Sequence, residues 1–100
     1  MSEKTLVIQI GNSDNKLSQR EWKDFCNYIH KSVEEYSNRI HFSAPSVGWA
    51  DWQNAAWIFS IHDKNVSYLL VDLENIRIMF RQDYIALTIG TTEMLGEKYG

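Results

Sequence analysis

The segment 18–37 constrains the fold more than any other stretch, because it carries a complete helix signature. Ser18 is an N-cap candidate, and Glu21, three residues later, completes a capping box. Leu17 and Trp22 flank this start at the spacing of a hydrophobic staple. Apolar side chains then recur every three or four positions, as on one face of a helix. They are Trp22, Phe25, Cys26, Ile29, Val33 and Tyr36.

Four other segments alternate apolar and polar residues with the period of a β-strand. They are residues 5–11, 39–44, 55–62 and 84–90. Residues 63–82 fit either a helix or two short strands joined by residues 72–75. We favour the helix, because Leu73 lies on its apolar face and neither glycine nor proline interrupts the stretch. Asp63 or Asn65 is the expected N-cap.

The order of elements is therefore strand, helix, strand, strand, helix, strand. This is the βαββαβ plan of the ferredoxin-like α+β fold, the split βαβ, with two helices on one face of a four-stranded antiparallel sheet. The expected strand order is 4-1-3-2, in which the second strand lies at an edge. Pro45, directly after the predicted strand 39–44, agrees with an edge position because proline cannot donate a ladder hydrogen bond.

One hundred residues predict a single domain, 1–100. Its tail is expected to be partly ordered through Met94 and Leu95 and to fray at about 96–100. The start of the chain runs directly into a strand-like segment, so no signal peptide is expected. The single cysteine, Cys26, indicates a reducing compartment, and the expected location is cytoplasmic.

The predicted topology brings several loops to one edge of the sheet. Segment 11–17 leaves the first strand there, segment 45–54 joins the second and third strands there, and the second helix ends there. The polar and aromatic residues expected to converge are Asn12, Asp14, Trp49, Asp51, Trp52, Gln53, Asn54, Arg81 and Asp83. We predict that this set binds a ligand or a partner.

Trp49 and Trp52 are the most informative members of the predicted site. They lie among Gly, Asp, Gln and Asn in a segment that reads as a loop. A large aromatic side chain on a loop either covers the end of a core or contacts a partner. The sequence alone leaves both interpretations open.

Neither a catalytic residue, nor a metal, nor a cofactor is predicted. Cys26 and His30 have a spacing that could share a metal, but the sequence has no second cysteine and no compact Cys/His cluster. The loop before the first helix has one glycine, and Asp14 and Glu21 near the helix start oppose a phosphate. The sequence thus lacks the usual signals for metal and phosphate chemistry.

The charge and hydropathy patterns narrow the classes of partner. A net charge of −3 argues against a nucleic-acid binder held by phosphate contacts. No apolar run approaches the roughly 20 residues that span a bilayer, so no membrane partner is expected.

The sheet face opposite the helices is expected to be neither aromatic nor basic, which argues against RNA binding. Its small, mixed side chains would tolerate a homodimer that packs through this open face. The residues expected there are Val7, Gln9, His41, Ser43, Ile58, Ser60, His62, Ala86 and Thr88.

Three segments resemble a family of small, uncharacterised bacterial proteins. They are Ile10–Gln19 (IGNSDNKLSQ), Trp52–Trp57 (WQNAAW) and Thr91–Leu95 (TTEML). The resemblance extends over nearly the whole chain and implies no particular activity.

Three functions remain as hypotheses. The first is a non-enzymatic interaction domain that binds a partner protein through the tryptophan-rich loop, as bacterial immunity or inhibitor proteins do. The second is a binding protein for a small planar, nucleotide-like ligand with polar edges, in which the loop tryptophans stack on the ligand. The third is an enzyme that uses the carboxylates of Asp14, Asp51 and Asp83.

Overall fold

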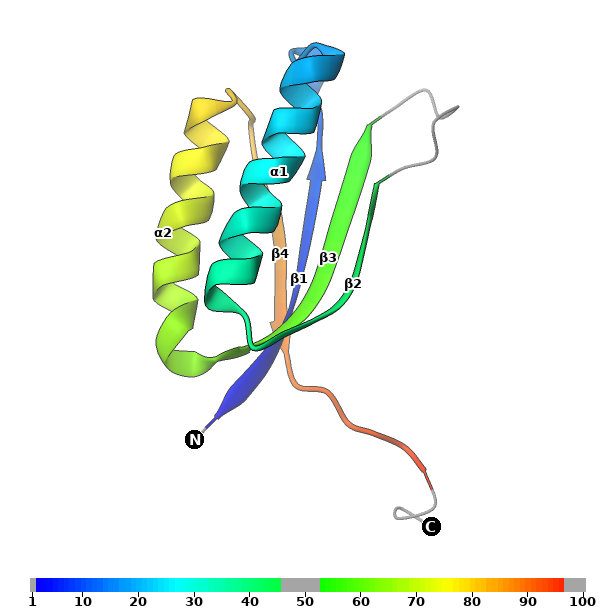
Figure 1. Cartoon of the computed structure of the whole chain (residues 1–100), viewed down its shortest axis with the longest axis vertical. Helices are drawn as coiled ribbons and strands as arrows, with labels where there is room; N and C mark the ends of the chain where they lie inside the picture. Colours follow the sequence, from blue (N-terminus) through cyan, green and yellow to red (C-terminus); the bar gives the residue numbers. More distant parts are fainter. Residues whose placement is uncertain (1, 46–52, 97–100) are drawn as a thin grey trace.

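The computed structural model describes residues 2–45 and 53–96, and the predicted ferredoxin-like α+β fold is confirmed. The elements are β1 (Glu3–Gly11), the 3-10 helix η1 (Ser13–Asn15), α1 (Gln19–Tyr36), β2 (Arg39–Pro45), β3 (Asn54–His62), α2 (Asp63–Met79) and β4 (Ala86–Gly90). The four strands form one antiparallel sheet in the order β2-β3-β1-β4. Helices α1 and α2 lie side by side on one face of it (Figure 1).

The capping box predicted from the sequence starts α1. The Ser18 hydroxyl accepts a hydrogen bond from the Glu21 N–H at 3.2 Å, and the Glu21 carboxylate accepts one from the Ser18 N–H at 3.0 Å. Two backbone donors that the helix itself cannot satisfy therefore find partners. Cys26 lies half-buried on this helix, and burial raises the pKa of its thiol to about 11, so the thiolate is scarce at neutral pH.

The core lies between the helices and the two central strands. Its side chains are buried and alternate along β1 and β3, which is why both strands show the period of two in the sequence. The buried apolar residues are Leu6, Ile8, Ile10, Leu17, Trp22, Phe25, Ile29, Val33, Ala55, Trp57, Phe59, Ile61, Leu69, Leu73, Ile76 and Phe80. Trp57 donates its indole N–H to His30 Nδ1 at 3.1 Å, so its one polar atom is satisfied inside the core.

The open face differs from the prediction because β2 contains a β-bulge. The register shifts between Ile40 and Phe42, so that Phe42 lies opposite Ile58 on the face away from the helices. Strict alternation would place Phe42 in the core and Ser43 on the open face. Instead Phe42 is 52% exposed on the open face, which is therefore partly aromatic.

One smaller expectation was also wrong. The N-cap of α2 is His62, the last residue of β3, and not Asp63 or Asn65. The described tail extends through Met94 and Leu95, and both side chains are exposed, at 76% and 84%. Residues 97–100, where fraying is expected, lie outside the described residues.

Replacing Ser18 with Ala should lower the free energy of unfolding by roughly 1 kcal/mol, because the Glu21 N–H loses its acceptor. Urea denaturation followed by circular dichroism would measure the change. Ser18→Asn, which restores a capping oxygen, is the matched control and should stay close to wild type. Equal midpoints for the Ala variant and wild type would contradict a role for this cap.

Candidate functional site

The described members of the predicted site do converge at one end of the sheet. Asn12 and Asp14 follow the end of β1, and Gln53 precedes β3. Arg81 and Asp83 follow the end of α2, which lies at the same end of the molecule (Figure 1). We call this surface the loop end of the sheet. The predicted members Trp49, Asp51 and Trp52 lie outside the described residues.

Asn12 joins three parts of the loop end through its side chain. Its Nδ2 donates to the Leu17 carbonyl at 3.0 Å and to Gln53 Oε1 at 2.5 Å, while its Oδ1 accepts from the Leu17 N–H at 2.9 Å. Gln53 in turn donates to Gln19 Oε1 at 3.0 Å. Gln53, which follows Trp52 in the sequence, is therefore hydrogen-bonded to the start of α1.

Gln82 makes a second connection, which the predicted site did not include. Its side chain is 2% exposed, accepts from the Ser13 N–H at 2.8 Å and donates to the Phe80 carbonyl at 3.0 Å. The Asp83 N–H adds a bond to the Ser13 hydroxyl at 3.3 Å. A glutamine after a helix carries no sequence signal for burial, so only the tertiary structure could identify this role.

Arg81 occupies a backbone position that favours glycine. Helix α2 ends in a Schellman motif, in which the Arg81 N–H bonds to the Ile78 carbonyl at 3.1 Å and the Gln82 N–H to the Arg77 carbonyl at 3.0 Å. Arg81 therefore has a φ of 57°, in the left-handed region. A residue with a Cβ atom is strained there by roughly 1–2 kcal/mol relative to a right-handed conformation.

Left-handed backbone is concentrated at the loop end. Among the described residues, the non-glycine residues with positive φ are Asp14, Asn15 and Arg81. Asp and Asn tolerate this conformation, whereas arginine rarely adopts it. All three belong to the segments that follow β1 and α2, so the backbone strain lies where the predicted site residues converge.

Two ion pairs connect elements across the loop end. Lys16 Nζ lies 3.1 Å from Asp83 Oδ1, and Arg81 Nη2 lies 3.1 Å from Glu21 Oε2. The Ser18 N–H lowers the pKa of Glu21, and the Arg81 guanidinium lowers it further, so this carboxylate is charged at neutral pH. Within residues 2–45 and 53–96, no group of three His, Cys, Asp or Glu side chains could hold a metal ion.

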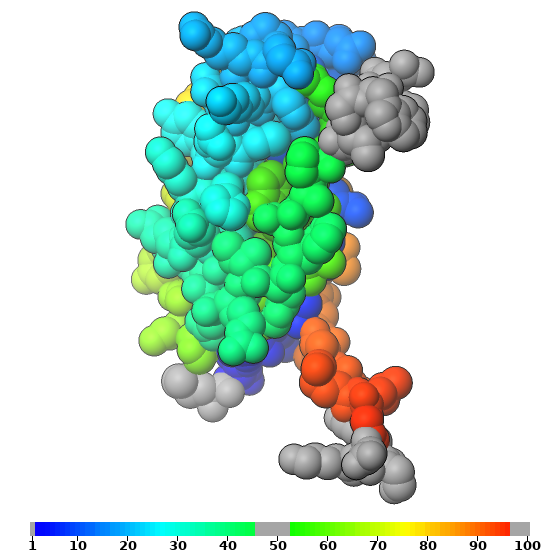
Figure 2. All heavy atoms as spheres, turned by 45° about the vertical axis from the view of Figure 1, so that its right-hand side comes forward, coloured from blue at the N-terminus to red at the C-terminus, as the bar shows by residue number. Residues whose placement is uncertain are grey.

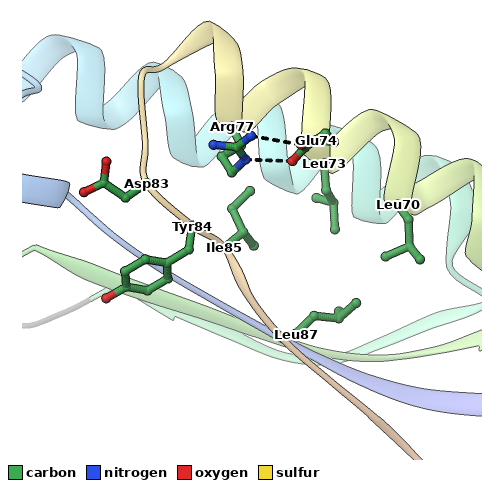
Figure 3. A pocket seen from close by; sticks show the side chains of 8 residues that line it. All are labelled: Leu70, Leu73, Glu74, Arg77, Asp83, Tyr84, Ile85 and Leu87. Carbon is green, nitrogen blue, oxygen red and sulfur yellow. Dashed lines mark hydrogen bonds and ion pairs between the residues drawn. The ribbon is translucent and has the colours of Figure 1, made fainter.

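Tyr84 is a further surface residue of the loop end that the prediction missed. It is 70% exposed, and its ring points away from α2, whereas the neighbouring Ile85 points toward the helix (Figure 3). Its sequence signal is an aromatic residue that directly follows the polar run 81–83 and precedes the alternation of 85–89.

Two adjoining hollows share Tyr84, Gly11 and Asn54. One, of about 310 Å³, is lined by Gly11, Asn12, Ser13, Asp14, Gln53, Asn54 and Tyr84. The other, of about 450 Å³, is lined by Gln9, Ile10, Gly11, Ala44, Pro45, Asn54, Ala55, Ala56, Tyr84 and Ala86 and extends onto the open face. Each volume lies within the range of small-molecule sites, although both hollows are shallow and open to solvent.

Solved structures with the same arrangement confirm the ferredoxin-like fold. A dimeric ferredoxin-like protein of unknown function from Thermobifida fusca has a TM-score of 0.63 at 6% identity, covering 92% of this chain and 93% of its own. A dimeric ferredoxin-like protein from Bacteroides fragilis has a TM-score of 0.58 at 13% identity, covering 90% and 95%. The de novo designed protein Foldit4 has a TM-score of 0.63 at 12% identity, covering 92% and 100%.

No protein-family model matches this chain, and no curated protein sequence matches it. In the part of the chain that the structure describes, neither helix is long and apolar enough to cross a membrane.

Replacing Arg81 with Gly should raise the free energy of unfolding by about 0.5–1 kcal/mol. Glycine removes the left-handed strain, and this gain exceeds both its extra unfolded-state entropy and the exposed ion pair with Glu21. Arg81→Ala is the matched control, because it loses the same ion pair but keeps the Cβ atom, and it should not stabilise. A destabilised glycine variant in urea denaturation would contradict the strain argument.

Proposed function

We propose that this protein is a non-catalytic, immunity- or inhibitor-like interaction domain that binds a partner protein through the loop end of the sheet. The observation that carries the proposal is the left-handed Arg81, an exposed cation kept at a position where glycine would be more stable. Strained backbone conformations cluster at functional sites, because selection for stability alone would remove them.

The hydrogen bonds of the loop end suit binding of a partner protein better than catalysis. Asn12 and Gln82 use their polar atoms to fix segments of backbone, which holds the surface in one conformation. A preorganised surface loses less entropy on binding. Exposed Tyr84 and Arg81 are residue types that dominate interface energies, as are Trp49 and Trp52 in the segment between Pro45 and Gln53.

The proposal also includes a cellular location and a source for the protein. The single cysteine supports a cytoplasmic location, and the resemblance of three segments to a bacterial family supports a bacterial source. The carboxylate-dependent enzyme gains little support, because Asp83 is engaged in an ion pair with Lys16 and belongs to a rigid connection between loops.

Replacing Trp49 or Trp52 with Ala should weaken binding of the partner by about 2 kcal/mol, or roughly thirtyfold in affinity, with little change in stability. Partners captured by the immobilised protein would be identified by mass spectrometry. Each would then be titrated against wild type and variants by isothermal calorimetry.

Trp57→Ala is the matched control for these two variants. Trp57 is buried in the core, so its truncation should cost roughly 3–5 kcal/mol of unfolding free energy, seen by urea denaturation. If Trp49→Ala and Trp52→Ala both lose stability on this scale, the two residues belong to the core and the proposed contact role is wrong.

A small-molecule binder is the second candidate, favoured by the two hollows that meet at Tyr84. A planar ligand could stack on the tyrosine ring while Asp14 binds its polar edge. A thermal-shift screen of nucleotides and related metabolites would separate the candidates. A stabilisation that is abolished by Tyr84→Ala and retained by Tyr28→Ala, an exposed tyrosine on α1, would favour the ligand.

The proposal also includes self-association through the open sheet face. Phe42, Ile58 and Val7 give this face an apolar centre, and small residues of β2, β3 and β4 surround it. Two of the structures with the same fold are described as dimeric, and each covers at least nine-tenths of this chain. A mostly uncharged face of this kind, with Glu3 and Arg39 at one end of it, suits packing against a second copy.

The area of the open face is small for a stable interface. At about 3.4 Å per residue and 4.8 Å between strands, the four strands span roughly 500 Å² per protomer. Two copies would bury at least about 1,000 Å² in total, because side chains make the accessible area larger than this planar outline, and about 1,000 Å² is the lower limit for specific complexes. A stable dimer would therefore benefit from contacts beyond the sheet face.

Phe42→Glu should raise the dimer dissociation constant at least about tenfold, because it places a charge beside Ile58 within the apolar patch of the open face. Analytical ultracentrifugation over a concentration series would measure the constant. Val71→Glu, a change of the same chemistry at an exposed position of α2, is the control and should have no effect. Equal constants for Phe42→Glu and wild type would show that the open face is not the interface.

A further inference from the structure

The two edges of the sheet differ in how well they are protected against pairing. The β2 edge carries Arg39, a bulge and Pro45, all of which discourage another strand from joining. Residues 84–92, which include β4, contain no charged residue and no proline and are rich in β-branched side chains. In the part of the chain that the structure describes, β4 pairs on one side with β1, so its outer edge is available to an added strand.

An apolar groove runs beside this edge, between α2 and β4. It has a volume of about 300 Å³, and Leu70, Leu73, Ile85 and Leu87 provide its apolar lining. Figure 3 shows Leu70 and Leu73 pointing from α2 toward the strand segment that carries Ile85 and Leu87. The groove exists because the two helices cover mainly the central strands and leave the space above β4 partly open.

The polar side chains at the rim of the groove have ion-pair and hydrogen-bond partners within the same chain. Arg77 Nε lies 2.7 Å from Glu74 Oε1, and Arg77 Nη1 donates to the Gln82 carbonyl at 2.9 Å. This ion pair raises the pKa of Arg77, so the rim keeps both charges, and Asp83, the third charged residue of the lining, is paired with Lys16. An occupant of the groove therefore needs an apolar side chain and no compensating charge.

The chain itself carries such side chains in its tail, residues 91–96. Leu95 and Met94 are the most exposed of the large apolar residues that the structure describes, at 84% and 76%. Thr92 shares a hydrogen bond with Thr5, which fixes the start of the tail against β1. Beyond this point the tail leaves the body on the side away from both helices (Figures 1 and 2).

We propose that the tail is a clasp for a second copy of this chain: beyond Thr92, which stays bound to its own β1, residues 93–96 of each protomer add as a strand to the outer edge of the partner's β4. The inference rests on the proposed self-association through the open face. Consider a two-fold axis that lies between the two packed sheets and is perpendicular to their strands. It places the β4 strands of the two protomers at the same side of the dimer, and these two strands run in opposite directions. The end of each β4, where the tail begins, then lies beside the start of the partner's β4, which is the part that borders the groove.

The spacing of the tail residues suits this arrangement. Successive side chains of a strand point to opposite faces of the sheet. Because Met94 and Leu95 are consecutive, either register places one of them over the partner's groove and the other over the apolar space between the sheets. Each protomer's tail makes the same contact with the β4 of its partner. The two contacts add buried area to the open-face interface, which is small by itself.

Cross-linking between two differently labelled chains tests the clasp directly. In a Cys26→Ala background, one chain carries Leu95→Cys and the other carries Leu87→Cys in the groove. Mild oxidation of the mixture should give a disulfide between the two chains, detected by mass spectrometry. A pair with Lys23→Cys on the exposed side of α1 in place of Leu95→Cys is the control. Cross-linking of the tail at the control level would overturn the clasp.

A second measurement separates failure of the clasp from failure of the dimer. The full chain with Met94→Ser and Leu95→Ser should dissociate at least about tenfold more readily in analytical ultracentrifugation. Gly96→Ser, in open space on the same tail, should match wild type. If Phe42→Glu disrupts the dimer but the tail variant does not, the clasp is wrong and the open-face dimer stands. If wild type stays monomeric at its highest soluble concentration, both are wrong.

Discussion

The structure depends on burial of the apolar faces of α1 and α2 against one face of a four-stranded sheet. The helices bury the inward-facing side chains of β1 and β3, such as Leu6, Ile8 and Phe59, almost completely. Both helices lie on the same face of the sheet, and they do not cover all of its width (Figure 1). One-sided packing therefore leaves an open face, an unprotected edge strand and a groove beside that edge.

The same layering determines where polar chemistry can collect. The loops after β1 and α2 and the residue before β3 meet at one end of the sheet. The backbone N–H and C=O groups of these segments need hydrogen-bond partners other than those within the sheet and the helices. Asn12 and Gln82 provide that satisfaction from within the chain, and Arg81 accepts a left-handed backbone there. The result is a hydrogen-bonded surface with exposed aromatic and cationic side chains, on which the proposed recognition role depends.

The differences between prediction and structure come from particular residues. A β-bulge turns Phe42 outward, and no single-sequence pattern distinguishes a bulge from simple alternation. Gln82 is buried because η1 packs beside it, which no local signal predicts.

The sequence by itself determined the type and order of the elements, the cap of α1 at Ser18 and the end of the sheet where Asn12, Gln53 and Arg81 meet. These features follow from local periodicity, short-range hydrogen bonding and the connectivity of the fold. Only the tertiary structure decided which side chains face the open side of the sheet, which polar groups are buried and which apolar ones lack cover. Those outcomes depend on register and on contacts between residues far apart in the chain, which local pattern does not encode.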